Sequence, residues 1–245
     1  MPNDLNVAFD IINLERAWKW TLTNSESIYK SYFRAIYEAY SVADEKLLGH
    51  LKEKLKRGIY EPTDACKIYF PKKSGILRPY TLLCVEDQIV YQALVNIIAE
   101  KVYPAVRQRY YKETFGHLYA GQKSRYFYRS WRIGYRKFGK AIKDAYNKGY
   151  VHRAFFDLTA CYDSIDHNVL KRFLEEVGVD SDFINFLLKC LRHWTKADTE
   201  KQIYQGHGIP QGPLPSGLLA EVILSHFDNQ RSVSRKISIL GTSTK

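Results

Sequence analysis

The stretch that decides the fold is FFDLTACYDSIDH, residues 155–167. It completes an alternating apolar segment, so we predict a strand from Tyr150 to Asp157 with the carboxylate of Asp157 at its end. A carboxylate at the rim of a sheet can bind a hard cation such as Mg²⁺. The structural alternative is a turn or capping aspartate. The apolar run before Asp157 and the aromatic Tyr162 five residues later favour metal binding, although one carboxylate is too few for paired metals.

A loop rich in glycine and proline, GHGIPQGPLPSG, occupies residues 206–217 and leads into the apolar segment 218–224. Prolines stiffen such a loop, and glycines let its backbone approach a ligand closely. Gln211 is its candidate polar recognition residue. Between the two stretches, Asp166 is expected to cap a helix that Gly178 ends.

The first part of the chain predicts helices followed by a hairpin. Apolar residues recur at three- and four-residue spacing from residue 13 to 57, and strand patterns flank the turn at 71–75. A helix is expected over 87–103, ended by Pro104. The basic hairpin side chains that could bind a triphosphate are Lys72, Lys73 and Arg78. Solvated surface charge remains the alternative for all three.

Positive charge is concentrated in one stretch. The 245 residues carry 37 Lys and Arg against 26 acidic residues, a net charge of +11 that favours a polyanionic partner. Residues 107–140 hold ten basic side chains interleaved with ten aromatic ones, the mixture that binds phosphates and stacks unpaired bases. The candidate nucleic-acid-binding residues are Arg125, Arg129, Trp131, Arg132 and Arg136. A buried aromatic stripe with a charged outer face is the alternative.

Several protein classes conflict with the sequence. Apolar residues make up 45% of the chain, which is typical of a globular domain. The longest charge-free stretch, 202–220, contains three prolines and cannot form a membrane helix, and residues 1–14 lack the pattern of a signal peptide. The four cysteines show no paired spacing, so we expect reduced thiols and a cytoplasmic protein without a membrane partner.

Three motifs, in order, resemble those of bacterial reverse transcriptases, the set that includes group II intron, retron and phage-defence enzymes. Residues 67–94 resemble the fingers region. Residues 156–167 resemble the first palm motif, and Gly208 to Gly212 with Ser216 resembles the next one. The amino-acid sequence of residues 213–220 is most similar to that of the phage-defence and abortive-infection relatives.

The resemblance implies an α+β fold with right-hand polymerase fingers and a partial palm. Its domains would be a helical lead-in (1–60), a fingers-like region (61–149), a partial palm (150–229) and a disordered or out-of-frame tail (230–245). The implied activity is RNA-directed DNA polymerisation by two-metal phosphoryl transfer. The expected partners are an RNA template, a DNA or RNA primer and deoxynucleoside triphosphates, with a noncoding RNA or a partner protein as further candidates.

The resemblance also assigns roles to residues. Asp157 would bind the catalytic Mg²⁺, with Leu158 as a second metal-site residue, and Tyr162 would exclude a ribose 2′-hydroxyl. Lys72, Lys73 and Arg78 would hold the triphosphate. The pocket around the template and the incoming nucleotide would be lined by Gln211 and Gly212.

The sequence departs from the family pattern near its end. A Tyr-x-Asp-Asp hairpin and a thumb would follow, and neither occurs before Lys245. Because the composition changes near Gln230, we expect a frameshift or truncation there, which sequencing of the encoding DNA would test. The alternative to a polymerase is therefore a catalytically inactive, nucleic-acid-binding remnant of one.

Overall fold

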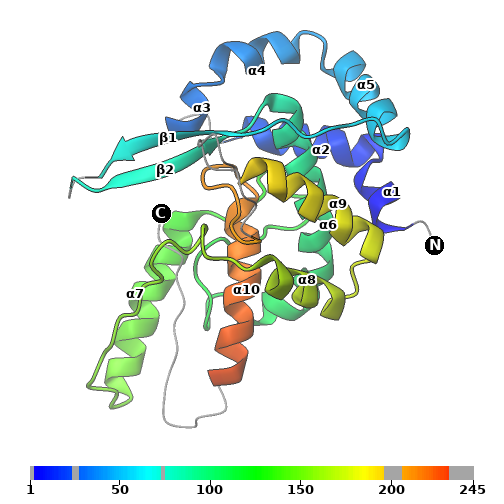
Figure 1. Cartoon of the computed structure of the whole chain (residues 1–245). Helices are drawn as coiled ribbons and strands as arrows, with labels where there is room; N and C mark the ends of the chain where they lie inside the picture. The colour runs from blue at the N-terminus through cyan, green and yellow to red at the C-terminus, as the bar shows by residue number, and fades with distance from the viewer. Residues whose placement is uncertain (1–2, 24–27, 73–74, 196–205, 232–245) are drawn as a thin grey trace. The chain divides into compact units, whose positions relative to one another are not determined.

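The structure is a computed structural model that describes residues 3–23, 28–72, 75–195 and 206–231 (Figure 1). The protein has an α+β fold, and within these residues the one sheet is a two-stranded hairpin. The chain forms two compact units. Unit 1 comprises Met1–Ile98 and Tyr162–Ser216, and unit 2 comprises Ala99–Cys161 and Gly217–Lys245.

The predicted N-terminal helices are confirmed. They are α1 (Asp4–Ala8), α2 (Ile11–Leu22), α3 (Ile28–Ser31), α4 (Arg34–Ser41) and α5 (Asp44–Lys56). The side chain of Asp10 accepts a hydrogen bond from the backbone N–H of Ile12 at 3.2 Å, which caps the start of α2. The core face of α2 buries Leu14 and Trp18, and α2 packs against α5.

The predicted hairpin consists of β1 (Cys66–Pro71) and β2 (Leu77–Leu82), which pair antiparallel with Phe70 opposite Arg78. The backbone N–H of Lys72 donates to the carbonyl of Ile76 at 2.8 Å, next to the turn. Lys72 is exposed, whereas Lys73 lies outside the described residues.

The helix after the hairpin is longer than predicted. Most side chains of α6 (Val85–Val106) are buried, and Pro104 lies within this helix. The expectation that Pro104 ends the helix is therefore wrong. A proline has no N–H to donate, and its ring crowds the carbonyl four residues before it, but this one stands in the last turn and the helix ends two residues later.

A buried carboxylate at the start of α6 holds the chain that leads into β1. Asp87 is 1% exposed and accepts hydrogen bonds from the hydroxyls of Tyr60 and Thr63 and from the backbone N–H of Thr63 at 3.1 Å. Hydrogen bonds to a charged group each contribute about 1.5–3 kcal/mol. We expect Asp87→Ala to lower the free energy of unfolding in urea by about 3 kcal/mol or more.

The matched variant is Tyr60→Phe, which removes one of these donors and keeps the carboxylate. It should cost about 1–2 kcal/mol, less than Asp87→Ala. An Asp87→Ala protein as stable as one carrying the exposed substitution Asp182→Asn would contradict this role for Asp87.

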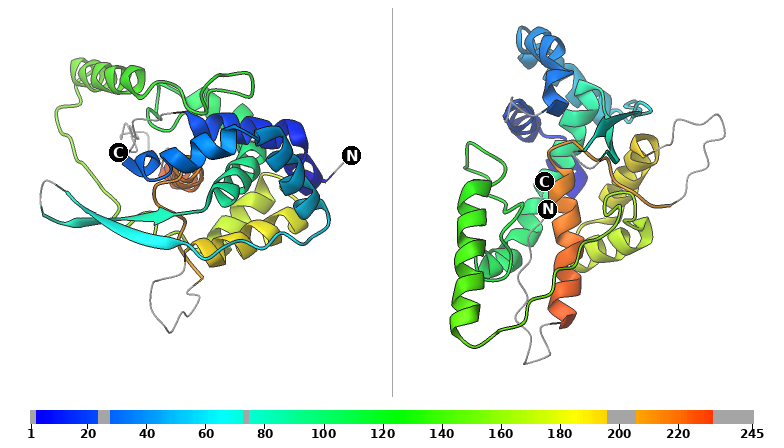
Figure 2. Two further views of the ribbon diagram at one scale, coloured as in Figure 1. Left: turned by 90° about the horizontal axis from the view of Figure 1, so that it is seen from above. Right: turned by 90° about the vertical axis from the view of Figure 1, so that its left-hand side faces the viewer.

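The remaining helices are α7 (Trp131–Asn147), α8 (His167–Glu176), α9 (Ser181–Trp194) and α10 (Ser216–Arg231), and a short 3₁₀ helix, η1 (Arg107–Arg109), follows α6. As predicted, the carboxylate of Asp166 caps α8, accepting from Asn168 N at 2.7 Å, and Gly178 follows the helix with φ of +77°. α8 and α9 lie side by side, as Figure 2 shows. α10 includes Gln230 and Arg231, the first residues of the expected tail, and 232–245 lie outside the described residues.

The strand predicted for Tyr150–Asp157 is absent. Residues 151–158 are irregular and exposed, and the apolar side chain of Phe156 is 87% exposed. A strand exists only when its backbone groups pair with a neighbour, and among the described residues no strand pairs with this segment. The alternating segment therefore forms no strand, because no neighbouring strand among the described residues pairs with its backbone.

All four cysteines are free thiols in the structure. In the part of the chain that the structure describes, no helix combines the length and the apolar character needed to cross a membrane.

Candidate functional site

In unit 1, the palm-like turn, residues 162–167 in the second half of the first palm-like motif, is joined to the glycine- and proline-rich loop by backbone hydrogen bonds. Ile209 N donates to Tyr162 O at 2.8 Å, and Gly208 N donates to Ile165 O at 2.7 Å. His167 N donates to the carbonyl of residue 206 at 2.9 Å. The two motifs, more than forty residues apart, therefore form one structural element that places Tyr162 beside the loop.

His167 is a buried anchor of this loop. Its Nε2 lies 2.6 Å from the carbonyl oxygen of Gly208, so Nε2 carries the proton and donates. Gly208 has φ of +99°, and a Cβ there would meet the carbonyl of Asp163 and the side chain of Thr195 at 3.6 Å. The positive φ, more than the space, is what requires glycine at this position.

Because His167 is buried, we expect the free energy of unfolding to depend on pH. Burial lowers the pKa of His167 below its ordinary 6.5, although the hydrogen bond to Gly208 acts in the opposite direction. Below pH 6.5 the unfolded chain therefore binds more protons than the folded one, and the free energy of unfolding should fall as the pH decreases from 6.5 through the lower folded pKa. Urea unfolding at a series of pH values measures this slope.

The control is a pair of substitutions. His167→Gln keeps a donor but removes the titration, so it should flatten the pH dependence in this window, and the exposed His50→Gln should not. Equal slopes in the parent and His167→Gln would contradict the assignment.

The hairpin joins the same element through two contacts that sequence reasoning missed. Thr81 N donates to the carbonyl of Gln211 at 2.7 Å. The ammonium of Lys67 lies 3.7 Å from Oδ1 of Asp163, and the Lys67 side chain is only 18% exposed. Sequence alone offered no signal for either pair, because the partners are far apart in the chain.

The loop is also fixed to the core at its far end. The hydroxyl of Ser216 lies 3.1 Å from that of the fully buried Tyr91 on α6, and it donates to the carbonyl of Pro210. Burial raises the pKa of Tyr91, which therefore keeps its proton and remains a hydrogen-bonding hydroxyl.

The predicted site residues divide between the two units. Unit 1 contains the nucleotide-pocket candidates Tyr162, Gln211 and Gly212 and the hairpin cations Lys72 and Arg78. Unit 2 contains the metal candidates Asp157 and Leu158. The structure thus brings the palm-like turn, the loop and the hairpin together within unit 1.

The surroundings of Asp157 can be compared with what Mg²⁺ requires. Its Oδ1 accepts the backbone N–H of Leu158 at 3.0 Å, and both residues are exposed. One carboxylate with one backbone carbonyl fits an ion that takes its other oxygens from water and substrate phosphates. Among the residues that are described, no three His, Cys, Asp or Glu side chains form a group that could hold a metal.

In unit 2, arginines lie over aromatic rings on the surface predicted to bind nucleic acid. The Arg129 guanidinium is 5.2 Å from the ring centroid of Tyr110 and 5.9 Å from that of Tyr111, and its Nη2 donates to the hydroxyl of Tyr103 at 3.3 Å. Arg132 lies over Trp131 at 5.8 Å, and Trp131 is 62% exposed. Arg125 is placed similarly over Tyr126, and Arg136 is exposed on α7.

The basic and aromatic residues of 107–140 are partly buried and partly exposed, so each of the two predicted arrangements is found in part. Phe127 and Tyr119 are buried, as the alternative interpretation expects, whereas the arginines and Trp131 face solvent. Rings that support a guanidinium leave its N–H groups available to bind phosphate oxygens.

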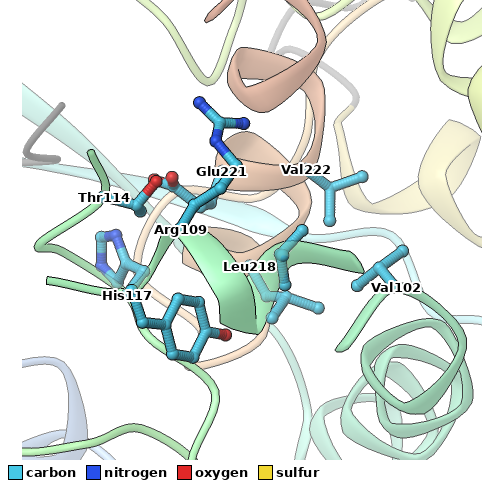
Figure 3. A pocket seen from close by; sticks show the side chains of 9 residues that line it. Val102, Arg109, Thr114, His117, Leu218, Glu221 and Val222 are labelled. Atoms are coloured by element: carbon cyan, nitrogen blue, oxygen red, sulfur yellow. The ribbon is translucent and has the colours of Figure 1, made fainter. Parts of the chain in front are cut away.

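A small pocket in unit 2 was not predicted (Figure 3). Polar side chains of Thr114 and His117 gather on one side of it and Val102 and Val222 on the other. A Cβ on Gly217 would lie 2.5 Å from the His117 ring, so α10 can approach this ring only because Gly217 lacks a side chain. The pocket draws residues from two separated stretches, 102–117 and 218–222, which no local motif reveals.

Relatives of known name support the family resemblance. Protein YkfC of Escherichia coli (strain K12) is 24% identical over 179 residues, which is 73% of this chain and 43% of YkfC. The group II intron-encoded protein LtrA of Lactococcus lactis subsp. cremoris is 27% identical over 190 residues, 75% of this chain and 28% of LtrA. The chain thus spans less than half the length of these relatives.

Solved structures give the fold. A chain of a structure titled "Partial Cas6-RT-Cas1--Cas2 complex" superimposes with a TM-score of 0.54 at 15% identity, covering 95% of this chain and 35% of that one. The family model described as "Reverse transcriptase (RNA-dependent DNA polymerase)" matches residues 70–239, which include β2, the palm-like turn and the loop. The chain therefore belongs to the reverse transcriptase family.

Proposed function

We propose that the chain supplies the fingers and part of the palm of an RNA-directed DNA polymerase, which extends a primer 3′-hydroxyl with deoxynucleotides on an RNA template. The observation that carries the proposal is the joined element of unit 1. Hydrogen bonds hold the Tyr162 turn to the Gln211 loop, and the loop to the basic hairpin. A nucleotide pocket needs such a rigid frame, because small displacements of reacting groups cost large factors in rate.

Each part of this frame has a proposed task. Arg78 and Lys72 neutralise the triphosphate, the arginine by forked hydrogen bonds and the lysine as a point charge. Tyr162 closes the pocket beneath the sugar and excludes a 2′-hydroxyl. Gln211 and Gly212 line the pocket around the template base and the incoming nucleotide.

The proposed reaction is attack of the primer 3′-hydroxyl on the α-phosphate, with pyrophosphate leaving. Asp157 and the carbonyl of Leu158 are the proposed Mg²⁺ ligands, and the bound ion would neutralise charge on the phosphate oxygens. A two-metal site needs further carboxylates, and among the described residues Asp157 belongs to no group of three His, Cys, Asp or Glu side chains that could hold a metal. Truncation before a Tyr-x-Asp-Asp hairpin, the phage-defence role and a noncoding RNA or protein partner remain predictions from the sequence.

A second candidate is a nucleic-acid-binding protein without catalysis. One reason is the arginine–aromatic surface of unit 2, formed without any metal ligand by Arg125, Arg129, Trp131, Arg132 and Arg136 with the neighbouring tyrosine rings. A second reason is that the segment carrying Asp157 is irregular and exposed. This candidate shares the RNA partner with the polymerase and differs only in the chemistry.

Primer extension by the unmodified chain distinguishes the two. With Mg²⁺, a poly(A) template, an oligo(dT) primer and dTTP, the proposal expects incorporation that depends on template and primer. RNA binding without incorporation would overturn the polymerase proposal for this chain and support the second candidate.

A further inference from the structure

Three aromatic rings from separate elements meet on one face of the hairpin. The ring centroids of Tyr32 and Phe70 are 5.9 Å apart, and those of Phe70 and Tyr80 are 5.3 Å apart with perpendicular planes. Tyr32 belongs to the segment between α3 and α4, and α3 lies beside β1 in Figure 1. The Tyr32 side chain is 53% exposed although it touches the hairpin.

The pairing register of β1 and β2 places Arg78 on the same face as the aromatic rings of the hairpin. Phe70 lies opposite Arg78, and Ile68 lies opposite Tyr80, so the side chains of Phe70, Arg78 and Tyr80 share one face of the sheet. Residues 66–82 contain three lysines and this arginine but no acidic residue. Lys67 pairs with Asp163, whereas Arg78 adds its positive charge to the ring surfaces of this face.

We propose that Tyr32, Phe70, Tyr80 and Arg78 form a stacking surface for unpaired bases of a single-stranded nucleic acid. The inference rests on the proposed function, since the strand held there would be the template. Tyr32 is 53% exposed while its ring contacts that of Phe70, so part of the Tyr32 ring remains available to a base. In RNA binding without a bound triphosphate, Arg78 is available to bind the adjoining phosphate of the strand.

Tyr32 lies among the N-terminal helices and not in the motifs that define the family. The residues matched by the family model begin at 70, so Tyr32 lies outside them. The N-terminal helices would therefore contribute directly to nucleic-acid binding. If Tyr32 instead serves only to fasten its segment to the hairpin, any apolar side chain of similar size should replace it.

Substitutions at Tyr32 separate these roles. We expect Tyr32→Leu, which keeps an apolar contact with Phe70, to weaken binding of a short unstructured RNA by roughly 5- to 100-fold, because one base loses its stacking partner. Tyr32→Phe keeps the ring and should bind like the parent. Ile36→Ala is the matched control, because Ile36 is also 53% exposed and lies on the next turn of the chain.

Fluorescence anisotropy over a range of salt concentrations measures both parts of the surface. Arg78→Gln should reduce the salt dependence of binding by about 0.7 in the logarithmic slope, and Tyr32→Leu should leave the slope unchanged. Thermal unfolding of each variant shows that it is folded. A fully paired RNA duplex should bind Tyr32→Leu and the parent equally, because its bases are not available for stacking.

Unchanged affinity of Tyr32→Leu for single-stranded RNA would overturn the inference, as would an equal loss for the duplex. The same experiments can reject the proposed polymerase function independently of the stacking surface. A parent that binds single-stranded RNA through Tyr32 without extending a primer would retain the stacking surface and reject catalysis, whereas a parent that extends a primer and is indifferent to Tyr32→Leu would reject the stacking surface alone.

Discussion

In the primer-extension reaction with Mg²⁺ and a poly(A) template, Asp157→Ala should reduce incorporation by about 10³-fold or more. A metal ion at a phosphoryl oxygen contributes several kcal/mol of charge stabilisation, and each 1.36 kcal/mol is a factor of ten in rate. Asp157 is exposed and makes only one local hydrogen bond, to Leu158 N, so the protein should fold without its carboxylate. Asp157→Asn, which keeps the shape and removes the charge, should lose as much activity.

The controls separate chemistry from binding. RNA affinity should survive Asp157→Ala, because the arginine–aromatic surface does not involve this carboxylate. Asp182→Asn removes an equally exposed carboxylate on α9 and should leave incorporation unchanged. Incorporation that persists in Asp157→Ala would show that Asp157 is not a metal ligand.

Two glycines of the same helix should respond to alanine in opposite directions. Gly134 is buried near the start of α7, and a Cβ there would lie 2.2 Å from the carbonyl oxygen of Phe115. A backbone atom cannot rotate away, so Gly134→Ala should displace α7 and lower the free energy of unfolding by about 1–3 kcal/mol or more. Around Gly139 nothing lies within 4 Å, and Gly139→Ala should raise stability by up to about 1 kcal/mol, because alanine favours the helix.

Urea unfolding followed by circular dichroism measures this difference. The displacement should also disturb Arg132 and Arg136, which lie on either side of Gly134 on α7, so RNA affinity should fall in Gly134→Ala and stay unchanged in Gly139→Ala. A shift of the same sign and size in both variants would mean that α7 does not pack on the chain at Phe115.

Local patterns predicted most of the helices and the hairpin. Helical spacing, the cap at Asp166 and the turn at Gly178 all depend on neighbours within a few residues, and each is confirmed. Pro104 shows the limit of a local rule, since this proline stands in the last turn and α6 ends two residues later.

The candidate site was only partly predictable. The motifs identified Tyr162 and Gln211, and the structure joins their segments in one element. The Lys67–Asp163 ion pair, the Thr81–Gln211 hydrogen bond and the contact of Tyr32 with the hairpin were not foreseen, because each links residues that no pattern in the sequence relates.

The sequence by itself determined the family, the order of the motifs and the residue types of the candidate site, because these depend on the identity and spacing of side chains. Only the tertiary structure decided which of them meet and whether Tyr150–Asp157 forms a strand. A helix makes its hydrogen bonds within its own segment, whereas a strand must find them in another, so its existence depends on the partner and not on its own residues.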